Sequence, residues 1–428
     1  MQKRTYIAIT SVITLLAIII TFLVTYVCMA NDFLAQREAL EEQYNERVDA
    51  LGDFASIAKL YESLPEELKN IEMYKKLAYI DMYYRSKYTG VIDEDEIVYT
   101  VANGYISGTG DMYGEYYTAD DFEAVMNDSA GNKVGIGVYV SLDVDTGYIK
   151  ILSVMKDGPA YKAGLLHGDI ITHVEGISVA EVGYYSAVDL VAGDDGTEVK
   201  ITVIRDGNTL DFTMKRAKVE TETVFYHKYA LDNKIGVIRI VEFNDAMPAQ
   251  FKSAVSQLLT DGCTSLVFDM RNNPGGTLGS VVEVLDYLLP EGDLVYIKNA
   301  RGEVMQKYTS DAGYINVPMA VLTNGNTASA AELFTSALMD YDKAVIVGEK
   351  TYGKGCGQSV LMLPDGSGLR LTTFLYDPPR SENYNGIGIT PDIVVELSEA
   401  LKDTHHFEYT DENDNQLKVA CDALKNKN

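Results

Sequence analysis

The 428-residue sequence predicts a multidomain protein of mixed α+β and α/β class. Three observations support this prediction. The length exceeds that of one compact domain, so two or three domains are expected. Residues 134–216 alternate apolar and polar positions in short runs, which is typical of half-buried strands. From residue 234 onward, strand-like and helix-like runs alternate, which is the pattern of an α/β layer.

Residues 1–32 predict a cytoplasmic N-terminus followed by a transmembrane anchor. Lys3 and Arg4 precede an uncharged run of 24 residues, Tyr6–Met29. About 20 apolar residues are enough to cross a bilayer as a helix, and the positive charges before the run place the N-terminus inside the cell. A cleaved signal peptide is the alternative, since Cys28-Met-Ala30 offers small residues at a cleavage site. In both cases the rest of the chain lies outside the cytoplasm, and an uncleaved anchor makes it a single-pass protein of the cell membrane.

The region after the anchor is predicted to be helical. Residues 33–88 carry Glu, Gln, Arg and Ala with spaced Leu and Tyr. They form either a self-association element, which would make the protein a homo-oligomer, or a solvated spacer. Residues 89–130 begin with an acidic helix start, continue through a Gly- and Tyr-rich stretch and form the N-terminal part of the core.

Composition limits the classes of partner and cofactor. The formal net charge of −27 argues against binding nucleic acid or anionic lipid through a basic patch. Of the four cysteines, one lies in the predicted membrane span and the others have unrelated spacings, so reduced thiols are expected. The sequence has no CxxC and no clustered His and Cys, so it predicts neither a metal site nor another cofactor.

The small domain, residues 131–217, is predicted from short strands and two short helices. Its strands are expected at 148–154 and 168–174 and in a hairpin of 198–205 and 209–215, and its helices at 158–164 and 182–191. The core, residues 218–400, is expected to have strands at 235–241, 265–270, 319–323 and 344–347, and helices at 247–260, 275–289 and 329–340. An amphipathic helix at 411–427 is predicted within the C-terminal region 401–428.

Ser329 is a candidate nucleophile because it follows an apolar strand and a turn, and small residues then open a helix. Unpaired N–H groups and the positive dipole end accumulate at a helix N-terminus. The N–H of Ala330 could therefore stabilise negative charge on a carbonyl oxygen. A serine needs a base, and none of the five histidines lies nearby in the sequence, so a lysine is the expected base. A serine that only caps the helix is the alternative.

Lys354 is the candidate base, and it lies between two glycines in a loop that is predicted to enter a strand. Residues four apart in an extended segment face the same way, so the Gln358 amide can orient the lysine amine. A lysine base must be neutral, which requires burial to lower its pKa from about 10.4. The alternative is a surface lysine in a glycine-rich loop.

Gly275 and Gly276 end a second strand-to-helix turn. Adjacent glycines permit backbone angles and close approaches that a Cβ would forbid. The N–H of either glycine could act as a second oxyanion donor. A turn that only starts the helix is the alternative.

Together these segments resemble the carboxyl-terminal processing peptidases, also called tail-specific proteases, a family of serine peptidases. The matching motifs follow the family's order over about three quarters of the chain. They are Gly110-Asp-Met-Tyr-Gly-Glu-Tyr-Tyr117, Gly135-Ile-Gly-Val138, Leu266-Val-Phe-Asp-Met-Arg-Asn-Asn-Pro-Gly-Gly276, Asn324-Gly-Asn-Thr-Ala-Ser-Ala-Ala-Glu332, Gly348-Glu-Lys-Thr-Tyr-Gly-Lys354 with Gln358, Gly386-Ile-Gly-Ile-Thr-Pro-Asp392 and Asp414-Asn-Gln-Leu417.

The resemblance implies roles for these residues in an α/β core of the ClpP/crotonase type. Ser329 would be the nucleophile, Lys354 the general base and Gln358 the residue that positions the lysine. The oxyanion hole would consist of Ala330 and the region of Gly275 and Gly276.

The resemblance also implies that residues 131–217 are a PDZ domain. The N–H groups of its loop, Gly135, Ile136, Gly137 and Val138, would bind the free carboxylate of a peptide that adds to a strand edge. Family members often carry an arginine where this chain has Ala192, so a gating contact made by that arginine is absent here.

The implied function is that of a membrane-anchored, extracytoplasmic serine endopeptidase that cleaves proteins near their C-termini. Its PDZ domain would bind the substrate's C-terminal tail and gate access. The alternatives are a catalytically silent scaffold that binds C-terminal peptides and a processing protease dedicated to one precursor. Cys356 stands where serine or another small residue is expected, so it has either a packing role or a role in redox control.

Overall fold

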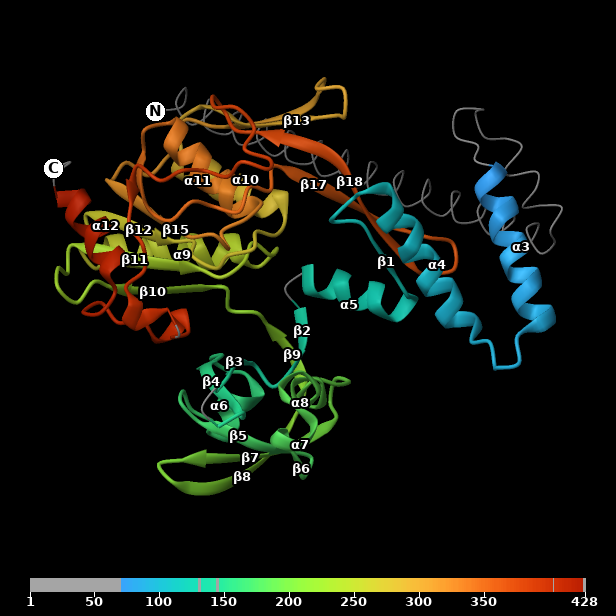
Figure 1. Cartoon of the computed structure of the whole chain (residues 1–428). Coiled ribbons are helices and arrows are strands. Elements are labelled where there is room, and N and C mark those ends of the chain that lie inside the picture. Colours follow the sequence, from blue (N-terminus) through green and yellow to red (C-terminus); the bar gives the residue numbers. More distant parts are fainter. Residues whose placement is uncertain (1–70, 130–131, 144–145, 403, 426–428) are drawn as a thin grey trace, which may run out of the picture. The chain divides into compact units, whose positions relative to one another are not determined.

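The computed structural model describes residues 71–129, 132–143, 146–402 and 404–425 (Figure 1). The predicted membrane anchor at 1–32 and the predicted helices before residue 71 lie outside these ranges. In the ranges that are described, no helix combines the length and apolar character needed to cross a bilayer.

The chain divides into two units. The smaller one includes the described residues up to Ala102 together with Met362–Gly366. It contains α3 (Ile71–Lys87) and the beginning of α4 (Glu94–Thr109). Arg85 on α3 forms exposed ion pairs with Asp81 on the same helix and with Glu94 at the start of α4, and the second pair joins the two helices.

The larger unit contains the small domain, whose main sheet has the strand order β3-β4-β5-β7-β8, with β6 beside β5. A separate antiparallel pair, β2 and β9, lies at the domain's two ends in the sequence. The apolar side chains of the sheet and helices form one buried cluster around Ile149, Ile151 and Val203. The elements are β2 (Asn132–Gly135), β3 (Val138–Leu142), β4 (Ile149–Val154), α6 (Pro159–Ala163), β5 (Ile170–Val174), β6 (Ile177–Ser178), α7 (Val179–Val182), α8 (Tyr184–Val191), β7 (Glu198–Arg205), β8 (Asn208–Lys215) and β9 (Ala217–Glu220).

The core is built on a second sheet, with the order β10-β11-β12-β15-β16-β19. Strands β11 to β19 in this sheet are parallel, and β10 is antiparallel to β11. Its elements are β10 (Val224–Lys228), β11 (Ile235–Ile240), α9 (Met247–Thr260), β12 (Ser265–Asp269), α10 (Leu278–Leu288), β15 (Met319–Thr323), α11 (Ala330–Asp340), β16 (Ala344–Gly348), β19 (Ile393–Val394) and α12 (Asn415–Lys425), with short 3₁₀ turns at Glu399–Leu401 and His406–Glu408.

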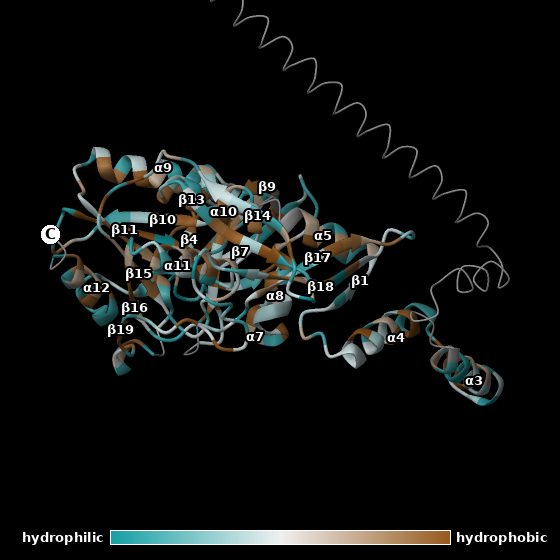
Figure 2. Ribbon diagram, turned by 90° about the horizontal axis from the view of Figure 1, so that it is seen from above, coloured by the Kyte–Doolittle hydropathy of each residue, from teal (hydrophilic) through white to brown (hydrophobic). Residues whose placement is uncertain are grey.

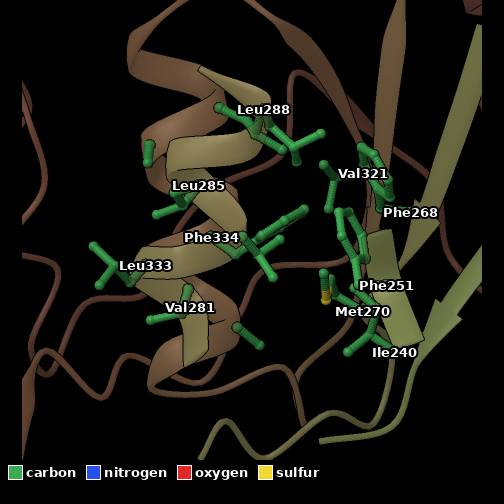
Figure 3. Packing of buried hydrophobic residues seen from close by; sticks show 14 of the residues in the cluster. Ile240, Phe251, Phe268, Met270, Val281, Leu285, Leu288, Val321, Leu333 and Phe334 are labelled. Carbon is green, nitrogen blue, oxygen red and sulfur yellow. The ribbon is translucent and has the colours of Figure 1, made fainter. Parts of the chain in front are cut away.

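Helices cover both faces of the core sheet. On one face α9, α10 and α11 pack around Phe251, Phe268 and Phe334 (Figure 3). On the other face α12 buries Leu417 and Leu424 against the strands, and its hydrophilic and hydrophobic residues are both visible in Figure 2. Because the parallel strands are buried on both faces, their sequences are almost continuously apolar.

A third sheet connects distant parts of the chain, with the order β1-β18-β13-β14 and β17 beside β18. Its strands are β1 (Glu115–Tyr117), β13 (Gly292–Lys298), β14 (Val304–Ser310), β17 (Cys356–Met362) and β18 (Gly368–Asp377), and α5 (Ala119–Ser129) follows β1. Pairing of β1 with β18 brings Asp111, just before β1, beside Thr372 of β18.

The predicted α/β multidomain class is confirmed, and so are most predicted core elements. The helix predicted at 247–260 is α9. The helix predicted from 275 begins only at Leu278, because Gly275 and Gly276 have φ angles of 102° and 140°, which a helix excludes. The helix predicted from 411 begins at Asn415, because Asp414 Oδ1 caps it by accepting hydrogen bonds from the N–H groups of Gln416 and Leu417 in its first turn.

Candidate active site

Ser329 is the last residue before α11, and its backbone is strained. Its φ of 56° and ψ of −122° are unusual for a residue with a side chain. Such strain is often found at functional sites, where the surrounding structure enforces it. The small side chains of Ala330 and Ala331 are buried beside it. Ser329 Oγ lies 3.3 Å from the hydroxyl of Tyr376.

Two strand-end turns are joined beneath the serine. Ala328 N–H donates to the Asn273 carbonyl at 3.0 Å, and Thr327 Oγ1 donates to the Met270 carbonyl at 2.8 Å. A Cβ on Gly275 would lie 2.6 Å from Ser329 Cβ and 2.8 Å from Ala330 N. Only glycine therefore fits at position 275.

The two glycines have different surroundings. The N–H of Gly275 donates to Asn273 Oδ1 at 2.8 Å, so it is already used. Gly276, together with Ala330 and Ser329, lines a cavity of about 510 Å³. Of the two glycines predicted as oxyanion donors, Gly276 is therefore the better candidate, and Gly275 supplies the space that the turn needs.

Lys354 also lines this cavity, as does Gln358. The lysine is half-buried in the loop before β17, as predicted, and its Nζ lies 4.3 Å from the ring centroid of Tyr113. Burial lowers the pKa of Lys354 below the ordinary lysine value, although the carboxylates of Asp111 and Glu332 act in the opposite direction. A lowered pKa is the property that a lysine base requires.

Gln358 contacts a different group from the one expected. Its amide donates to Thr372 Oγ1 at 3.2 Å, and Thr372 in turn donates its hydroxyl and its N–H to the Asp111 carboxylate, each at 2.8 Å. The amide is thus held by β18, and its predicted role toward the lysine amine stays a prediction.

Glu332 is a site residue that sequence reasoning missed. Its side chain is fully buried, and Oε2 accepts the N–H groups of Ser329 at 3.0 Å and of Lys354 at 2.7 Å. Oε1 accepts the Gly353 N–H at 2.7 Å and the Thr351 hydroxyl at 2.5 Å. Four donors suit an ionised carboxylate, which only accepts. One carboxylate therefore joins the backbones of the candidate nucleophile and the candidate base.

One contact of Glu332, that with the Ser329 N–H, could have been predicted from the local sequence. An acidic residue three positions after a serine at a helix start is the pattern of a capping box. The contacts of Glu332 with the loop of Lys354 are long-range and had no such signal.

Sequence reasoning also missed two buried tyrosines, whose hydroxyls lie close to the serine and lysine segments. Tyr376 Oη lies 2.6 Å from the Lys354 carbonyl oxygen, to which it donates. Tyr384 Oη lies 3.5 Å from the Ser329 carbonyl oxygen. Burial raises the pKa of both tyrosines, so both hydroxyls keep their protons.

The cavity continues over an apolar surface. Apart from the residues above, its lining includes Leu278, Leu333, Val360 and Phe374. Cys356 is buried, and burial raises the pKa of its thiol, which favours a packing role over reactivity. Cys263 and Cys421 are also unpaired and buried. In the described ranges, no group of three or more His, Cys, Asp or Glu side chains is arranged to hold a metal ion.

The predicted peptide-binding loop lines a separate cavity of about 210 Å³ in the small domain. Gly135, Ile136, Gly137 and Val138 all line it, and its other lining residues include Val188 and Ala192. The end of α8 beside Ala192 is held by the buried Arg216, which donates to the carbonyl oxygens of Leu190 at 2.8 Å and Val191 at 3.0 Å.

Fold and site together define an α/β core with a strained serine at a helix start and a half-buried lysine in the same cavity. Residues 234–395 match the model of Peptidase family S41, and residues 123–215 match that of the PDZ domain.

Related proteins also point to peptidase family S41. A "Probable CtpA-like serine protease" of Staphylococcus haemolyticus is 34% identical over 349 residues, which cover 81% of this chain and 68% of that protein. A "Carboxy-terminal-processing protease" of Bartonella bacilliformis is 32% identical over 334 residues, 76% of each chain. The structure of the "Putative S41 protease from Bacteroides fragilis NCTC 9343" has a TM-score of 0.51 at 20% identity and covers 69% of this chain and 84% of that one. The chain belongs to the carboxyl-terminal processing serine proteases of peptidase family S41 and contains a PDZ domain.

Proposed function

We propose that the protein is a membrane-anchored serine endopeptidase, outside the cytoplasm, that cleaves protein substrates near their C-termini with Ser329 and Lys354 as a catalytic dyad. The main support is the placement of both residues at one cavity, with their backbones joined by the buried Glu332 carboxylate. The lowered pKa of the half-buried Lys354 supports its role as the base.

In the proposed reaction the neutral Lys354 amine takes the proton of Ser329 Oγ while Oγ attacks the carbonyl carbon of the scissile bond. The N–H groups of Ala330 and Gly276 stabilise the oxyanion. The lysine ammonium then protonates the leaving amine, and an ester to Ser329 remains. Water, deprotonated by Lys354, hydrolyses that ester and restores the serine.

The reaction requires the lysine amine to leave its present contact. The lysine amine lies over the Tyr113 ring, and Ser329 Oγ lies beside Tyr376. For proton transfer the amine must come within hydrogen-bond reach of Oγ. Gln358, four residues after the lysine, is proposed to hold the amine in that position.

The substrate class follows from the two cavities. The apolar lining at Leu333 and Phe374 favours an apolar side chain next to the scissile bond. The loop of residues 135–138, with a wall that includes Val188 and Ala192, favours a free C-terminal carboxylate on an apolar residue. Binding of this tail by the PDZ domain would control access to the site.

The direct test is cleavage of an unstructured protein with an apolar C-terminus by the full chain in detergent, followed by mass spectrometry of the fragments. Fragments should appear with the natural chain and with Ser86→Ala, a change of an exposed serine on α3, but not with Ser329→Ala. Cleavage that persists in Ser329→Ala would exclude the nucleophile. Binding without cleavage by the natural chain would indicate a scaffold, and cleavage of one offered protein among many would indicate a dedicated processing protease.

The proposed anchor is tested separately. Residues 6–29 should keep the protein in the membrane fraction after alkaline washing, with the chain beyond them accessible to an added protease on the outer side. A soluble product that has lost residues 1–30 would indicate a cleaved signal peptide instead.

A further inference from the structure

The groove of the small domain has one free strand edge. Strand β3 is at the end of its sheet, so only one of its sides is paired, with β4. The cavity of about 210 Å³ is lined by β3 residues, including Val138 and Val140, and by α8 residues, including Val188 and Val191. A peptide that adds a strand to this sheet would lie between β3 and α8.

The outward-facing hydrogen-bonding groups of β3 can be assigned from its pairing with β4. The carbonyl oxygen of Gly137 accepts the N–H of Met155 on the β4 side. Along an antiparallel strand the backbone groups of alternate residues point to opposite sides. Gly137 and Tyr139 therefore face β4, and Val138 and Val140 face the groove.

One of these groove-facing groups already has a partner. The hydroxyl of Tyr184, the first residue of α8, donates to the Val140 carbonyl oxygen at 3.3 Å. Tyr184 is partly buried against the apolar cluster of the domain, so its ring is supported in this position. The hydroxyl bridges α8 and β3 at the end of the groove away from the 135–138 loop.

The register of a bound tail follows if its carboxylate is held by the N–H groups of the 135–138 loop. This step rests on the proposed function of that loop. The last residue of the tail then lies beside Val138, and the third-from-last residue lies beside Val140. In a regular ladder the N–H of that third-from-last residue would donate to the Val140 carbonyl oxygen.

We propose that Tyr184 is a specificity-determining residue. Its hydroxyl occupies the Val140 carbonyl oxygen, to which the N–H of the tail's third-from-last residue would otherwise donate, and so closes the groove at that end. The groove then recognises the carboxylate and the last two residues of a tail. Pairing over a longer stretch requires the Tyr184 hydroxyl to leave Val140. The ligand is a peptide with a free carboxylate and an apolar last residue.

The test compares two hexapeptides with identical apolar C-terminal sequences and free carboxylates. One is an ordinary peptide, and in the other an ester oxygen replaces the N–H of the third-from-last residue. Binding to the full chain in detergent is measured by fluorescence anisotropy, with Ser329→Ala in every sample to prevent cleavage. The variants are Tyr184→Phe, which keeps the ring, and Tyr185→Phe, which removes a hydroxyl from a neighbouring side chain that is 83% exposed.

With Tyr184 present, the two peptides should bind equally within about twofold. Tyr184→Phe should bind the ordinary peptide about fivefold more tightly and leave the ester peptide unchanged, since one neutral hydrogen bond contributes about 1 kcal/mol. Tyr185→Phe should behave as the natural sequence does.

Two results would overturn the inference while leaving tail binding intact. One is a clear preference for the ordinary peptide with Tyr184 present, which would show that Val140 bonds the tail despite the hydroxyl. The other is no gain in Tyr184→Phe. A C-terminal amide peptide that binds as tightly as the free carboxylate in every variant would contradict the tail-binding role itself and this inference with it.

Discussion

The serine and lysine segments of the candidate site share one anchor and differ in what holds their side chains. Glu332 accepts a backbone N–H from each segment. The serine side chain is fixed by a strained turn and by Gly275 packed against it. The lysine amine instead rests on the ring of Tyr113, which comes from a distant part of the sequence.

The difference shows that the lysine side chain can move more easily than the serine. The position of Ser329 is set by covalent geometry and buried hydrogen bonds, which allow little movement. The position of the Lys354 amine is set by a cation–π contact, a type of interaction that contributes about 0.5–2 kcal/mol. In the proposed reaction, the lysine side chain is therefore the part of the site that moves.

The largest effect is expected from removing the amine itself. Lys354→Met keeps the length and apolar character of the side chain and should lower kcat/KM by about 10⁴-fold or more, as for other members of a catalytic unit. Lys354→Arg should be equally inactive, because a guanidinium does not lose its proton near neutral pH. Peptide cleavage assays measure this, and substantial activity of Lys354→Met would exclude a lysine base.

The next largest effect is expected on the serine side. Gly275→Ala would place a Cβ 2.6 Å from Ser329 Cβ and 2.8 Å from the Ala328 carbonyl oxygen. The turn must shift, and kcat should fall on the order of 10²–10³-fold. Gly279→Ala in α10 is the matched control, since no atom lies within 4 Å of its added Cβ. Equal activities of the two variants would show that the turn tolerates displacement.

The shared anchor is tested by Glu332→Gln. An amide oxygen accepts but the amide NH₂ donates, so some of the four donors lose their partner. A displacement of about 1 Å can cost about 10²-fold, so kcat should fall by about 10- to 100-fold. The pH profile gives the more specific readout. Because the Glu332 charge raises the pKa of Lys354, its removal should move the acid limb of the rate profile to lower pH. A lowered rate with an unmoved limb would indicate a purely structural role.

The smallest effect is expected from Tyr376→Phe. This variant removes the hydroxyl that lies 3.3 Å from Ser329 Oγ and 2.6 Å from the Lys354 carbonyl oxygen. Loss of one such hydrogen bond costs about 1 kcal/mol, so kcat should fall about fivefold while KM stays similar. Tyr341→Phe, whose hydroxyl bonds the Asp293 carbonyl elsewhere in the core, is the control. A change in KM alone would place Tyr376 in substrate binding.

Local patterns in the sequence were sufficient for much of the fold. The apolar periodicity of α9 and of the parallel strands predicted their positions within a residue or two. Ser329 and Lys354 were also identified, because a turn before a helix and a glycine-flanked lysine are local features and the family's motifs occur in order.

Other parts of the site depend on contacts between segments that lie far apart in the sequence. Tyr113 and Asp111 reach the site because β1 pairs with β18, a register that no local pattern specifies. The Gln358 amide was expected to face Lys354, yet Thr372 on the neighbouring strand binds it. The hydrogen bond from the Tyr184 hydroxyl to the Val140 carbonyl oxygen joins α8 to β3, which no local pattern in the sequence predicts.

The central claim, that Lys354 is the base, is tested most directly by the pH dependence of the acylation rate of the natural chain. This rate is measured as the burst of leaving group released from an ester substrate. The rate should rise with pH along a limb whose midpoint lies below the ordinary lysine value of about 10.4, because only the deprotonated amine can accept the serine proton and burial lowers its pKa. A rate that does not change with pH, or a limb at the value of an exposed lysine, would contradict a buried neutral lysine as the base.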